Sequence, residues 1–388
     1  MEEIINPNEY GGLIMDNQEV DAVKQVILNE KIFRYATGKE SCTDLFEKDI
    51  CNKFGVQYAL GVNSGTSALK VALKAIGVQL KDRVLISSYT FLATATAVIA
   101  LGAIPIPIDF DLNYGLNLKD LENEIKKGCK AIIVVHLQGK CFDVRPIIKL
   151  KEKYGVSLIE DACQAMETKN KGKFSGTFGD LGVFSFQQNK PITCGEGGVI
   201  VTNSIKYYNI ARNYADMGSV RDYYPSWDKE GALIGDNYRM NNIQSAILRV
   251  QLSKMDKMQE IQMKNKEYIF KKIKINKVNE KIINKISNDD TGINILFLTT
   301  CKEKADICIE KAKDSNIEIR RLWNKPYYLH QVIRNEKLTP QDLNKGACTL
   351  AETIADNLIS ISLPPILKNE DLESIIRLIN QLIEEGSL

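Results

Sequence analysis

Between residues 58 and 161, short apolar segments typical of strands alternate with amphipathic segments typical of helices. This alternation predicts a mostly parallel sheet whose two faces are covered by helices. Ligands bind such sheets at the carboxyl ends of the strands, so residues at those ends are the first candidates for a functional site. The expected strands are Val84–Ser88, Ala103–Ile108, Ala131–His136 and Ser157–Ile159, and the expected helices between them include Leu118–Lys127 and Val144–Tyr154.

The sequence Ser64-Gly65-Thr66-Ser67 stands where an apolar strand starting at Tyr58 runs into an amphipathic helix. Free N–H groups and the helix dipole at such a start attract anions. Small hydroxyl and glycine residues together therefore favour a phosphate site. Plain capping of the helix is the alternative, because a cap needs only one of these hydroxyls.

Lys190 is a single lysine in a turn between two expected buried strands, VFSF at 183–186 and VIVT at 199–202. Its neighbours in the turn are polar but uncharged, and the small-residue turn GEGG follows. A partly buried ammonium group loses proton affinity, and the neutral amine is then a Schiff-base nucleophile. An ordinary loop lysine is the alternative.

Three further polar residues fall at candidate positions. Asp161 comes directly after an expected strand, where it either caps a helix or, in a pocket, holds a protonated ring nitrogen. His136 also ends a strand and is either a structural histidine or a site residue. His330, the second of two histidines, lies in an expected loop and is a candidate for substrate contact.

Composition excludes several classes of function. A net charge of +2 gives no reason to expect nucleic acid or an anionic membrane as partner. The nine cysteines include no CxxC pair, so neither a zinc site nor a disulfide framework is indicated, and we expect no metal site. No segment approaches the roughly 18 consecutive apolar residues of a membrane span, and no leader pattern is present, so we expect a cytoplasmic protein.

The length of 388 residues suits two lobes. We expect an N-terminal segment at 1–40 that packs on the lobes, a large domain at 41–255 and a small C-terminal α/β domain at 256–388. Within this scheme, 207–224 is a polar, tyrosine-rich segment, and GDNYRMNNIQSAILRVQL at 235–252 runs from a loop into a helix. A lysine-rich helix near 252–273 then connects the lobes. Other expected elements are the helices Asn17–Leu28, Cys42–Phe54, Lys304–Asn316 and Asn369–Glu384 and the strands Ile293–Leu298 and Ile317–Arg321.

Eight motifs occur in order along nearly the whole chain: FRYATG, VNSGTSAL, SSYTFLATATAVIALGAIPIPIDFD, VVHLQG, IEDACQA, FSFQQNK followed by GEGG, DNYRMNNIQSAIL and ISLPP. Together they resemble the DegT/DnrJ/EryC1/StrS family of sugar aminotransferases, which are pyridoxal-phosphate enzymes of fold type I. The resemblance implies a large domain with a mostly parallel, seven-stranded type of sheet and a smaller C-terminal α/β domain.

The resemblance also implies roles for the residues that match the family's motifs. Lys190 corresponds to the Schiff-base lysine and Asp161 to the partner of the pyridine nitrogen, which keeps the ring cationic as an electron sink. The other implied contacts with pyridoxal 5'-phosphate are Gly65, Thr66 and Ser185 to the phosphate, Gln164 to the phenolic oxygen, and Phe91, with Tyr89 as the alternative, stacked on the ring.

Asn237, in the motif DNYRMN, resembles an asparagine that reaches from a neighbouring subunit to the phosphate, which implies a homodimer with shared active sites. The implied reaction takes an amino group from glutamate or glutamine, leaves pyridoxamine 5'-phosphate, and then aminates a keto-sugar. The acceptor classes that the resemblance suggests are a nucleotide-linked keto-sugar, an 8-keto-octulosonate and an inosose.

Substrate-facing residues are expected in three segments, around Arg34, Arg320–Trp323 and Tyr327–His330. The candidates for substrate contact are Arg34, Trp323, Tyr328 and His330. Two positions depart from the commoner family pattern: Pro191 follows the lysine directly, and Met217 stands where many relatives have a histidine. Neither change removes a group that the chemistry needs.

Two other functions are compatible with this fold. One is a sugar dehydratase that uses pyridoxamine phosphate without a covalent lysine, and Lys190 argues against it because such relatives replace the lysine. The other is a non-catalytic binding or regulatory protein. The joint presence of five matching residues argues against loss of catalysis: Lys190, Asp161, Gln164, Ser185 and Thr66.

Overall fold

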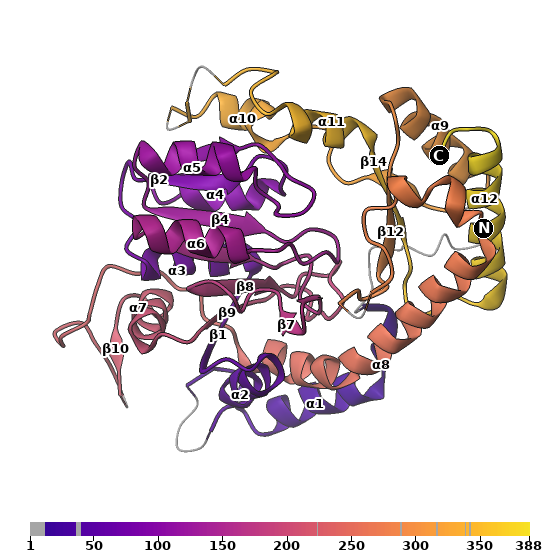
Figure 1. The fold of residues 1–388 in the computed structure, drawn as a ribbon. Helices are drawn as coiled ribbons and strands as arrows, with labels where there is room; N and C mark the ends of the chain where they lie inside the picture. Colours follow the sequence, from indigo (N-terminus) through magenta and orange to yellow (C-terminus); the bar gives the residue numbers. More distant parts are fainter. Residues whose placement is uncertain are drawn as a thin grey trace.

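A computed structural model describes residues 12–35, 40–222, 224–287, 289–315, 317–337, 339–340 and 343–388 (Figure 1). Of the expected N-terminal segment, 1–11 and 36–39, which include the end of the FRYATG motif, lie outside the described residues. The described chain forms a large lobe built on a seven-stranded sheet and a smaller lobe built on a three-stranded sheet.

The large sheet has the strand order β1-β9-β8-β5-β4-β2-β3. Five neighbouring strands from β8 to β3 run parallel, whereas β9 is antiparallel to both of its neighbours. The sheet is therefore mostly parallel, as predicted. Its strands are β1 (Tyr58–Val62), β2 (Arg83–Ser87), β3 (Ile104–Ile108), β4 (Ala131–Val135), β5 (Ser157–Asp161), β8 (Leu181–Ser185) and β9 (Gly198–Thr202).

Helices cover both faces of this sheet. Alternate residues of each strand point to opposite faces, and apolar side chains on both faces are buried against these helices. In β4, Ile133 and Val135 pack in the core that contains α3 (Gly65–Ala75), α4 (Leu92–Ile99) and α7 (Ile205–Ala215). Ile132 and Val134 pack in the core that contains α5 (Leu118–Lys126) and α6 (Arg145–Tyr154). A third core joins α2 (Cys42–Phe54) and α8 (Asn242–Lys272) to β1, β8 and β9.

The 31-residue helix α8 connects the lobes. Its first half packs against α1 (Asn17–Leu28) and α2, and its last turns carry Ile269 and Phe270 into the core of the small lobe. Two separate segments were expected here, a helix after the motif DNYRMN and another from about 252. The structure joins them, because neither glycine nor proline interrupts 242–272. The proposed boundary at 255 thus falls inside one continuous helix.

The small lobe contains the antiparallel sheet β12-β14-β13, with β12 (Asn294–Leu298), β14 (Leu358–Ser362) and β13 (Ile319–Arg321). Helices α9 (Lys302–Asp314), α11 (Thr349–Asn357) and α12 (Asn369–Glu384) pack around it, and α10 (Gln331–Arg334) is a single turn. The described fold also contains two hairpins, β6 (Lys169–Asn170) with β7 (Lys173–Phe174) and β10 (Val220–Arg221) with β11 (Pro225–Ser226). Short 3-10 helices lie at Gly12–Ile14, Ile275–Lys277, Asn279–Lys281 and Tyr327–Leu329.

Local sequence explains where the helices near the site begin. Ser64 is extended, and its hydroxyl accepts a hydrogen bond from Ser67 N–H, which starts α3 at Gly65. Gly198, the first residue of β9, lies against this turn, and a Cβ on it would stand 2.4 Å from the carbonyl oxygen of Ser64. Glycine at this position therefore allows β9 to lie directly beside the start of α3.

Candidate active site

A cavity of about 510 Å³ opens at the carboxyl ends of the large-sheet strands and is lined on the small-lobe side by Arg320, Leu322 and Trp323. Every predicted cofactor residue except Asn237 lines it. Parallel strands bring their carboxyl ends to one edge of the sheet, which explains how residues scattered from 65 to 190 meet here. The strand pattern predicted that these residues would meet at one edge of the sheet.

One end of the cavity is an anion-binding arrangement. Gly65 and Thr66 open α3, and the first N–H groups of a helix have no partner within the helix. Ser185, the last residue of β8, lies directly against Gly65, since a Cβ added to Gly65 would stand 2.7 Å from the Ser185 Cβ. Any larger residue at 65 would push into the Ser185 side chain and close the space.

Lys190 lies in the turn after β8, where its N–H donates to the carbonyl of Gln187 at 2.9 Å. Burial lowers the pKa of the Lys190 amine, because a low-polarity environment disfavours the charged form. Cys163 and Asp161 oppose this shift, whereas the positive charge of Arg320 adds to it. The amine is therefore poised to lose its proton more readily than a surface lysine does.

Asp161 is the last residue of β5 and is 5% exposed. Its Oδ2 accepts a hydrogen bond from Thr94 Oγ1 at 2.9 Å, and its Oδ1 accepts one from Cys163 N–H at 3.2 Å. Thr94 in turn lies 2.9 Å from the hydroxyl of Thr90. Asp161 is therefore a held carboxylate on the cavity wall and does not cap any of the described α-helices.

Aromatic side chains form part of the rim. Phe91 is 56% exposed and lines the cavity, so its ring is available to a ligand. Tyr89, the alternative for the stacking role, is fully buried and packs edge-to-face on Trp323 with ring centroids 4.9 Å apart. Trp323 itself lines the cavity, as expected for a substrate residue.

Three predicted substrate residues do not line the cavity: Arg34, Tyr328 and His330. Arg34 is 3% exposed, donates to the Glu47 carboxylate at 2.8 Å and to the Gly61 carbonyl at 3.1 Å, and so holds the N-terminal segment to β1. Tyr328 is 1% exposed and donates to Glu352 at 2.5 Å. An arginine and a tyrosine can join a core when their polar atoms are paired, which their local sequence does not reveal.

His330 precedes the short helix α10, away from the cavity, and burial together with the charge of Lys325 lowers its pKa. Asn237 is exposed and also lies outside the cavity of its own chain. His136 is fully buried: its Nδ1 accepts from Phe142 N–H and its Nε2 donates to Glu160 at 2.8 Å. His136 is thus a structural histidine, one of the two alternatives stated above.

Several residues that line the cavity had no predicted role in the site, among them Thr94, Gln138, Cys163 and Glu196. Thr94 follows Thr90 by one helical turn, and this spacing was a signal that could have placed both hydroxyls on one face. Gln138 and Cys163 each lie two or three residues after a strand, next to positions that were singled out. Glu196 lies in the GEGG turn, which was noted only for its glycines.

The residues present fit pyridoxal phosphate. The cavity contains the start of a helix, an amine of lowered pKa, a hydrogen-bonded carboxylate and the exposed aromatic ring of Phe91. Gly65 would hold the phosphate with Thr66 and Ser185. Asp161 would face a protonated ring nitrogen, and Lys190 would bond the aldehyde carbon.

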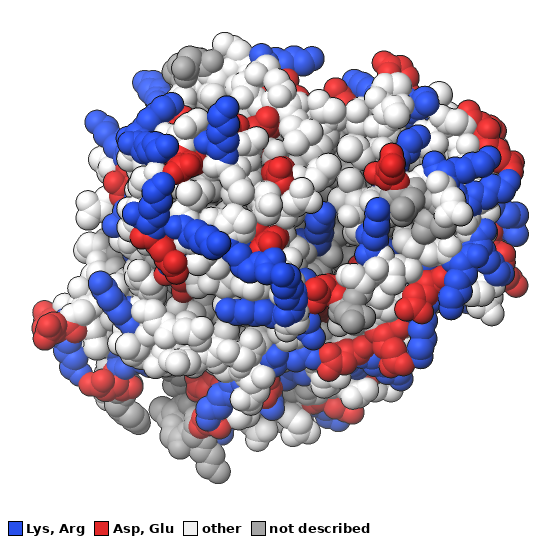
Figure 2. All heavy atoms as spheres, viewed as in Figure 1, with Lys and Arg blue, Asp and Glu red and all other residues white. Residues whose placement is uncertain are grey.

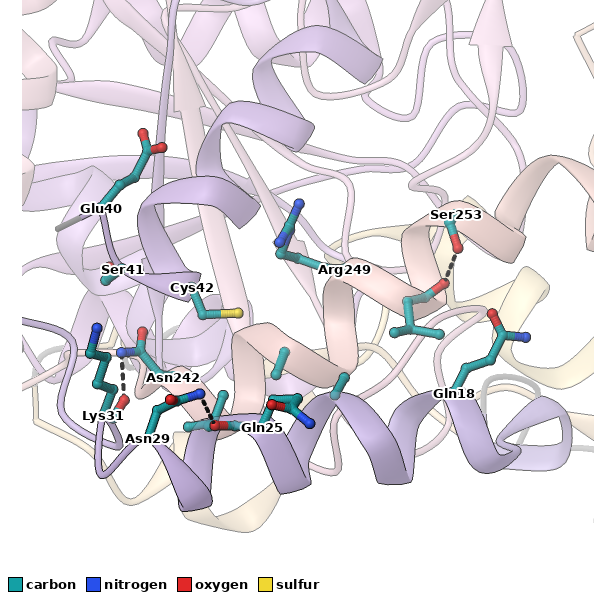
Figure 3. Close-up of a pocket in the computed structure, with 14 residues that line it drawn as sticks. Gln18, Gln25, Asn29, Lys31, Glu40, Ser41, Cys42, Asn242, Arg249 and Ser253 are labelled. Atoms are coloured by element: carbon teal, nitrogen blue, oxygen red, sulfur yellow. Dashed lines mark hydrogen bonds between the residues drawn. The ribbon is translucent and has the colours of Figure 1, made fainter.

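A second hollow, of about 480 Å³, lies between α1, α8 and the start of α2 (Figure 3). The Cys42 sulfur faces this hollow, but burial raises the pKa of its thiol, so little thiolate is present. Arg249 donates to Asp49 at 2.7 Å, and Asn242 donates to the Lys31 carbonyl at 2.8 Å. Arg249 and Asn242 are thus engaged within the protein, and we assign this hollow no chemistry.

Three further observations concern surface charge, hydropathy and metal-binding side chains. Lysines and arginines are interspersed with acidic side chains over the face shown in Figure 2. Among the described helices, none has both the length and the apolar character needed to cross a membrane. Within the described ranges, no group of three or more His, Cys, Asp or Glu side chains is placed to hold a metal ion.

The fold and the cavity together define a class: a two-lobed α/β enzyme with a lysine of lowered pKa near the start of a helix at the strand ends. The model of the DegT/DnrJ/EryC1/StrS aminotransferase family matches residues 14–380. The chain belongs to this family, and it is therefore a pyridoxal-phosphate-dependent sugar aminotransferase.

Two relatives and one solved structure illustrate the match. The chain is 31% identical over 363 residues to GDP-perosamine synthase of Escherichia coli O157:H7, covering 90% of this chain and 93% of that protein. It is 28% identical to dTDP-3-amino-3,6-dideoxy-alpha-D-galactopyranose transaminase of Aneurinibacillus thermoaerophilus, covering 89% and 91%. An aminotransferase structure from Psychrobacter cryohalolentis superposes with a TM-score of 0.84 at 23% identity, covering 96% and 98%, and supports the fold alone.

Proposed function

We propose that this enzyme transfers an amino group from glutamate or glutamine to the carbonyl carbon of a keto-sugar and that it works as a homodimer. The observation that carries the proposal is the meeting of Lys190, Asp161 and the start of α3 in one cavity. The relatives' names support a sugar acceptor, since both denote enzymes of amino-sugar synthesis.

Bound pyridoxal phosphate supplies an aldehyde carbon that exchanges amino groups and a ring that accepts electron density. Lys190 Nζ, once free and neutral, takes the proton from the donor's α-carbon and returns it to the cofactor side. Its lowered pKa favours the neutral form that this step needs. Asp161, held by Thr94, keeps the proton on the ring nitrogen.

Arg320 is our candidate for binding the donor's carboxylate. It lies on β13 in the cavity wall, and its Nε is buried without a hydrogen-bond partner in the described structure. A buried guanidinium nitrogen without a partner is costly, and a ligand carboxylate would satisfy it. Glutamate and glutamine both present such a carboxylate.

A second subunit is supported by the surface around Asn237. Asn237 is exposed, and exposed apolar side chains precede it: Met217 at 38%, Trp227 at 53% and Ile234 at 95%. Apolar side chains exposed on one segment are typical of a surface that another molecule covers. A partner subunit over this segment would bring Asn237 to the partner's phosphate site.

A dehydratase on the same fold is the second candidate, and Lys190 disfavours it. A dehydratase that forms no bond between a lysine and the cofactor does not need a lysine amine of lowered pKa, such as that of Lys190. A binding protein that lost catalysis would have no need of either Lys190 or the Thr94–Asp161 contact.

The test is visible absorption of the protein after loading with pyridoxal phosphate. We expect a yellow band that the Lys190→Ala variant lacks, that fades with glutamate or glutamine, and that returns when a suitable keto-sugar is added. A protein that binds the cofactor but whose band neither donor changes would contradict the transferase proposal. A wild-type protein without the lysine-dependent band would favour the dehydratase.

A further inference from the structure

Four side-chain amides form a hydrogen-bonded row that runs from the small lobe to the active-site cavity. Asn284 and Asn294 belong to the small-lobe segment around β12, whereas Gln138 and Gln164 line the cavity. Each amide donates through its nitrogen to the oxygen of the next one. An amide has a donor end and an acceptor end, so the orientation of one member constrains all the others.

The row starts at a group whose direction cannot be reversed. The backbone N–H of Leu296 donates to Asn284 Oδ1 at 2.8 Å, which makes that atom the oxygen of the amide. Asn284 Nδ2 then donates to Asn294 Oδ1 at 2.7 Å and to the Asn294 carbonyl at 3.0 Å. The Nδ2 of Asn294 is thereby directed toward Gln138.

The same polarity continues into the cavity. Asn294 Nδ2 donates to the Gln138 carbonyl at 3.1 Å and to Gln138 Oε1 at 3.2 Å. Gln138 Nε2 donates to Gln164 Oε1 at 3.1 Å. Because the oxygen of Gln164 is used in this contact, its Nε2 is the end left to donate into the cavity.

The members of the row are also held by the backbone around them. Asn284 and Asn294 are 7% and 1% exposed, and the buried Lys266 ammonium donates to the Asn284 carbonyl at 2.7 Å and to Asp290 at 2.6 Å. Gly139 N–H donates to the Gln164 carbonyl at 2.8 Å. These bonds hold the row's two ends, one on the small lobe and one at the cavity.

We infer that Asn294 and Gln138 are positioning residues that turn the Gln164 amide so that it presents a donor, not an acceptor, to the cofactor. The inference rests on the proposed function. The consequence is chemical: a donor stabilises negative charge on the phenolic oxygen of the ring, whereas an amide oxygen in its place would repel that charge. The amino-acid sequence alone does not determine which end of the Gln164 side-chain amide faces the cavity.

Two substitutions reverse the row with side chains of nearly the same shape, although Asn294→Asp also loses the hydrogen bond to the Gln138 carbonyl. Asn294→Asp replaces the donating nitrogen by an oxygen, so Gln138 turns to donate toward it, and Gln164 then turns to donate toward Gln138. Gln138→Glu replaces the nitrogen that donates to Gln164 by an oxygen, so Gln164 again turns to donate toward residue 138. Residue 138 is half-buried, where a carboxylate is better tolerated than at the buried position 294. In both variants the oxygen of Gln164 faces the cofactor.

The readout is the pH at which the visible band of the protein loaded with pyridoxal phosphate changes colour. In the loaded protein the Lys190 nitrogen would share a proton with the phenolic oxygen, and that oxygen would hold the proton more tightly after losing a hydrogen-bond donor. We expect the midpoint to rise by about one pH unit or more in both variants, the size that loss of a hydrogen bond to a charged oxygen produces. Thr291→Val is the matched control, because Thr291 lies in the same junction and its buried hydroxyl has no partner in the described structure.

The outcomes separate this inference from the proposed function. If wild-type protein forms no lysine-dependent band, both fail. If it forms the band but Asn294→Asp and Gln138→Glu titrate as wild type does, the positioning role is overturned and the proposed function stands. An equal shift in Thr291→Val also overturns it, since the effect would then be general to the junction. Should Asn294→Asp fail to fold, Gln138→Glu decides the question.

Discussion

The Thr94 hydroxyl donates a hydrogen bond of 2.9 Å to Asp161 Oδ2, which ties the start of α4 to the carboxylate at the end of β5. Thr94 is 1% exposed, so no water replaces it freely. We expect Thr94→Val to weaken pyridoxal phosphate binding by about tenfold, because a hydrogen bond to a charged group contributes about 1.5–3 kcal/mol. Equilibrium titration of each protein with the cofactor measures the dissociation constant. Thr96→Val is the control, since Thr96 bonds the Ala93 carbonyl instead.

Lys190 should capture the cofactor at a lower pH than an ordinary lysine does. Burial lowers its pKa, so the neutral, nucleophilic amine is present below the range in which free lysine loses its proton. We expect the rate of band formation with cofactor-free protein to rise with pH and to level off at a lower pH than the reaction of an ordinary lysine does. Arg320→Gln should move this midpoint upward, because Arg320 adds to the lowering. A downward shift in that variant would contradict the assigned cause.

Arg320 and Arg321 are neighbours on β13 with opposite orientations, and they make a matched pair. Arg320 lines the cavity, whereas Arg321 bonds Asp306 at 2.5 Å and the Asp356 carbonyl at 2.6 Å. We expect Arg320→Gln to raise the KM for the amino donor about 10- to 100-fold, the effect of losing a charged hydrogen bond. Arg321→Gln should leave that KM unchanged. Equal effects on KM would show that the donor carboxylate does not bind at Arg320.

Glu167 should make the protein less stable as pH rises. It is 2% exposed, neither carboxylate oxygen has a hydrogen-bond partner in the described structure, and burial raises its pKa to about 8. Between about pH 4.5 and about pH 8 the unfolded chain releases this proton while the folded chain keeps it, so the free energy of unfolding falls with pH. The slope contributed is at most about 1.4 kcal/mol per pH unit.

Urea unfolding across this pH range tests the assignment, with Glu167→Gln expected to flatten the dependence and to be the more stable protein at the alkaline end. Lys53 opposes the rise in the Glu167 pKa. Lys53→Met should therefore extend the falling region to higher pH. A Glu167→Gln variant with the wild-type pH dependence would show that Glu167 titrates normally.

Shared active sites predict recovery of activity in mixed dimers. Lys190→Ala lacks the reactive amine, and Asn237→Ala lacks the side chain proposed to reach the partner's phosphate site. In a hybrid of the two, one of the two sites has both residues intact, so a random mixture should regain about a quarter of wild-type activity above either variant alone. The measurement is turnover after the two variants are unfolded together and refolded. No recovery, with dimers present by light scattering, would place Asn237 in its own chain's site.

Much of the local structure could be read from the sequence. The helices Asn17–Leu28, Cys42–Phe54 and Asn369–Glu384 have the bounds that were predicted, and the first two begin at the capping residues Asp16 and Ser41. Helix α7 was missed, because the many tyrosines and polar residues of 205–215 weaken its apolar periodicity.

The sequence also determined which strand ends would meet. Gly65, Phe91, Asp161 and Lys190 follow strands of one mostly parallel sheet, and local pattern plus that geometry suffice to bring them to one edge. Caps, turns and hydrophobic periodicity extend over only a few residues, which is why a single sequence reveals them.

Only the tertiary structure decided which residues distant in the sequence contact the active-site cavity. It placed Arg320 in the cavity while it buried Arg34 against Glu47, although both are arginines outside the large sheet. It also aligned Asn294 with Gln138, 156 residues apart, and so set the direction of an amide in the site. These outcomes depend on how the small lobe packs on the large one, and that packing is the sum of many contacts that no local pattern records.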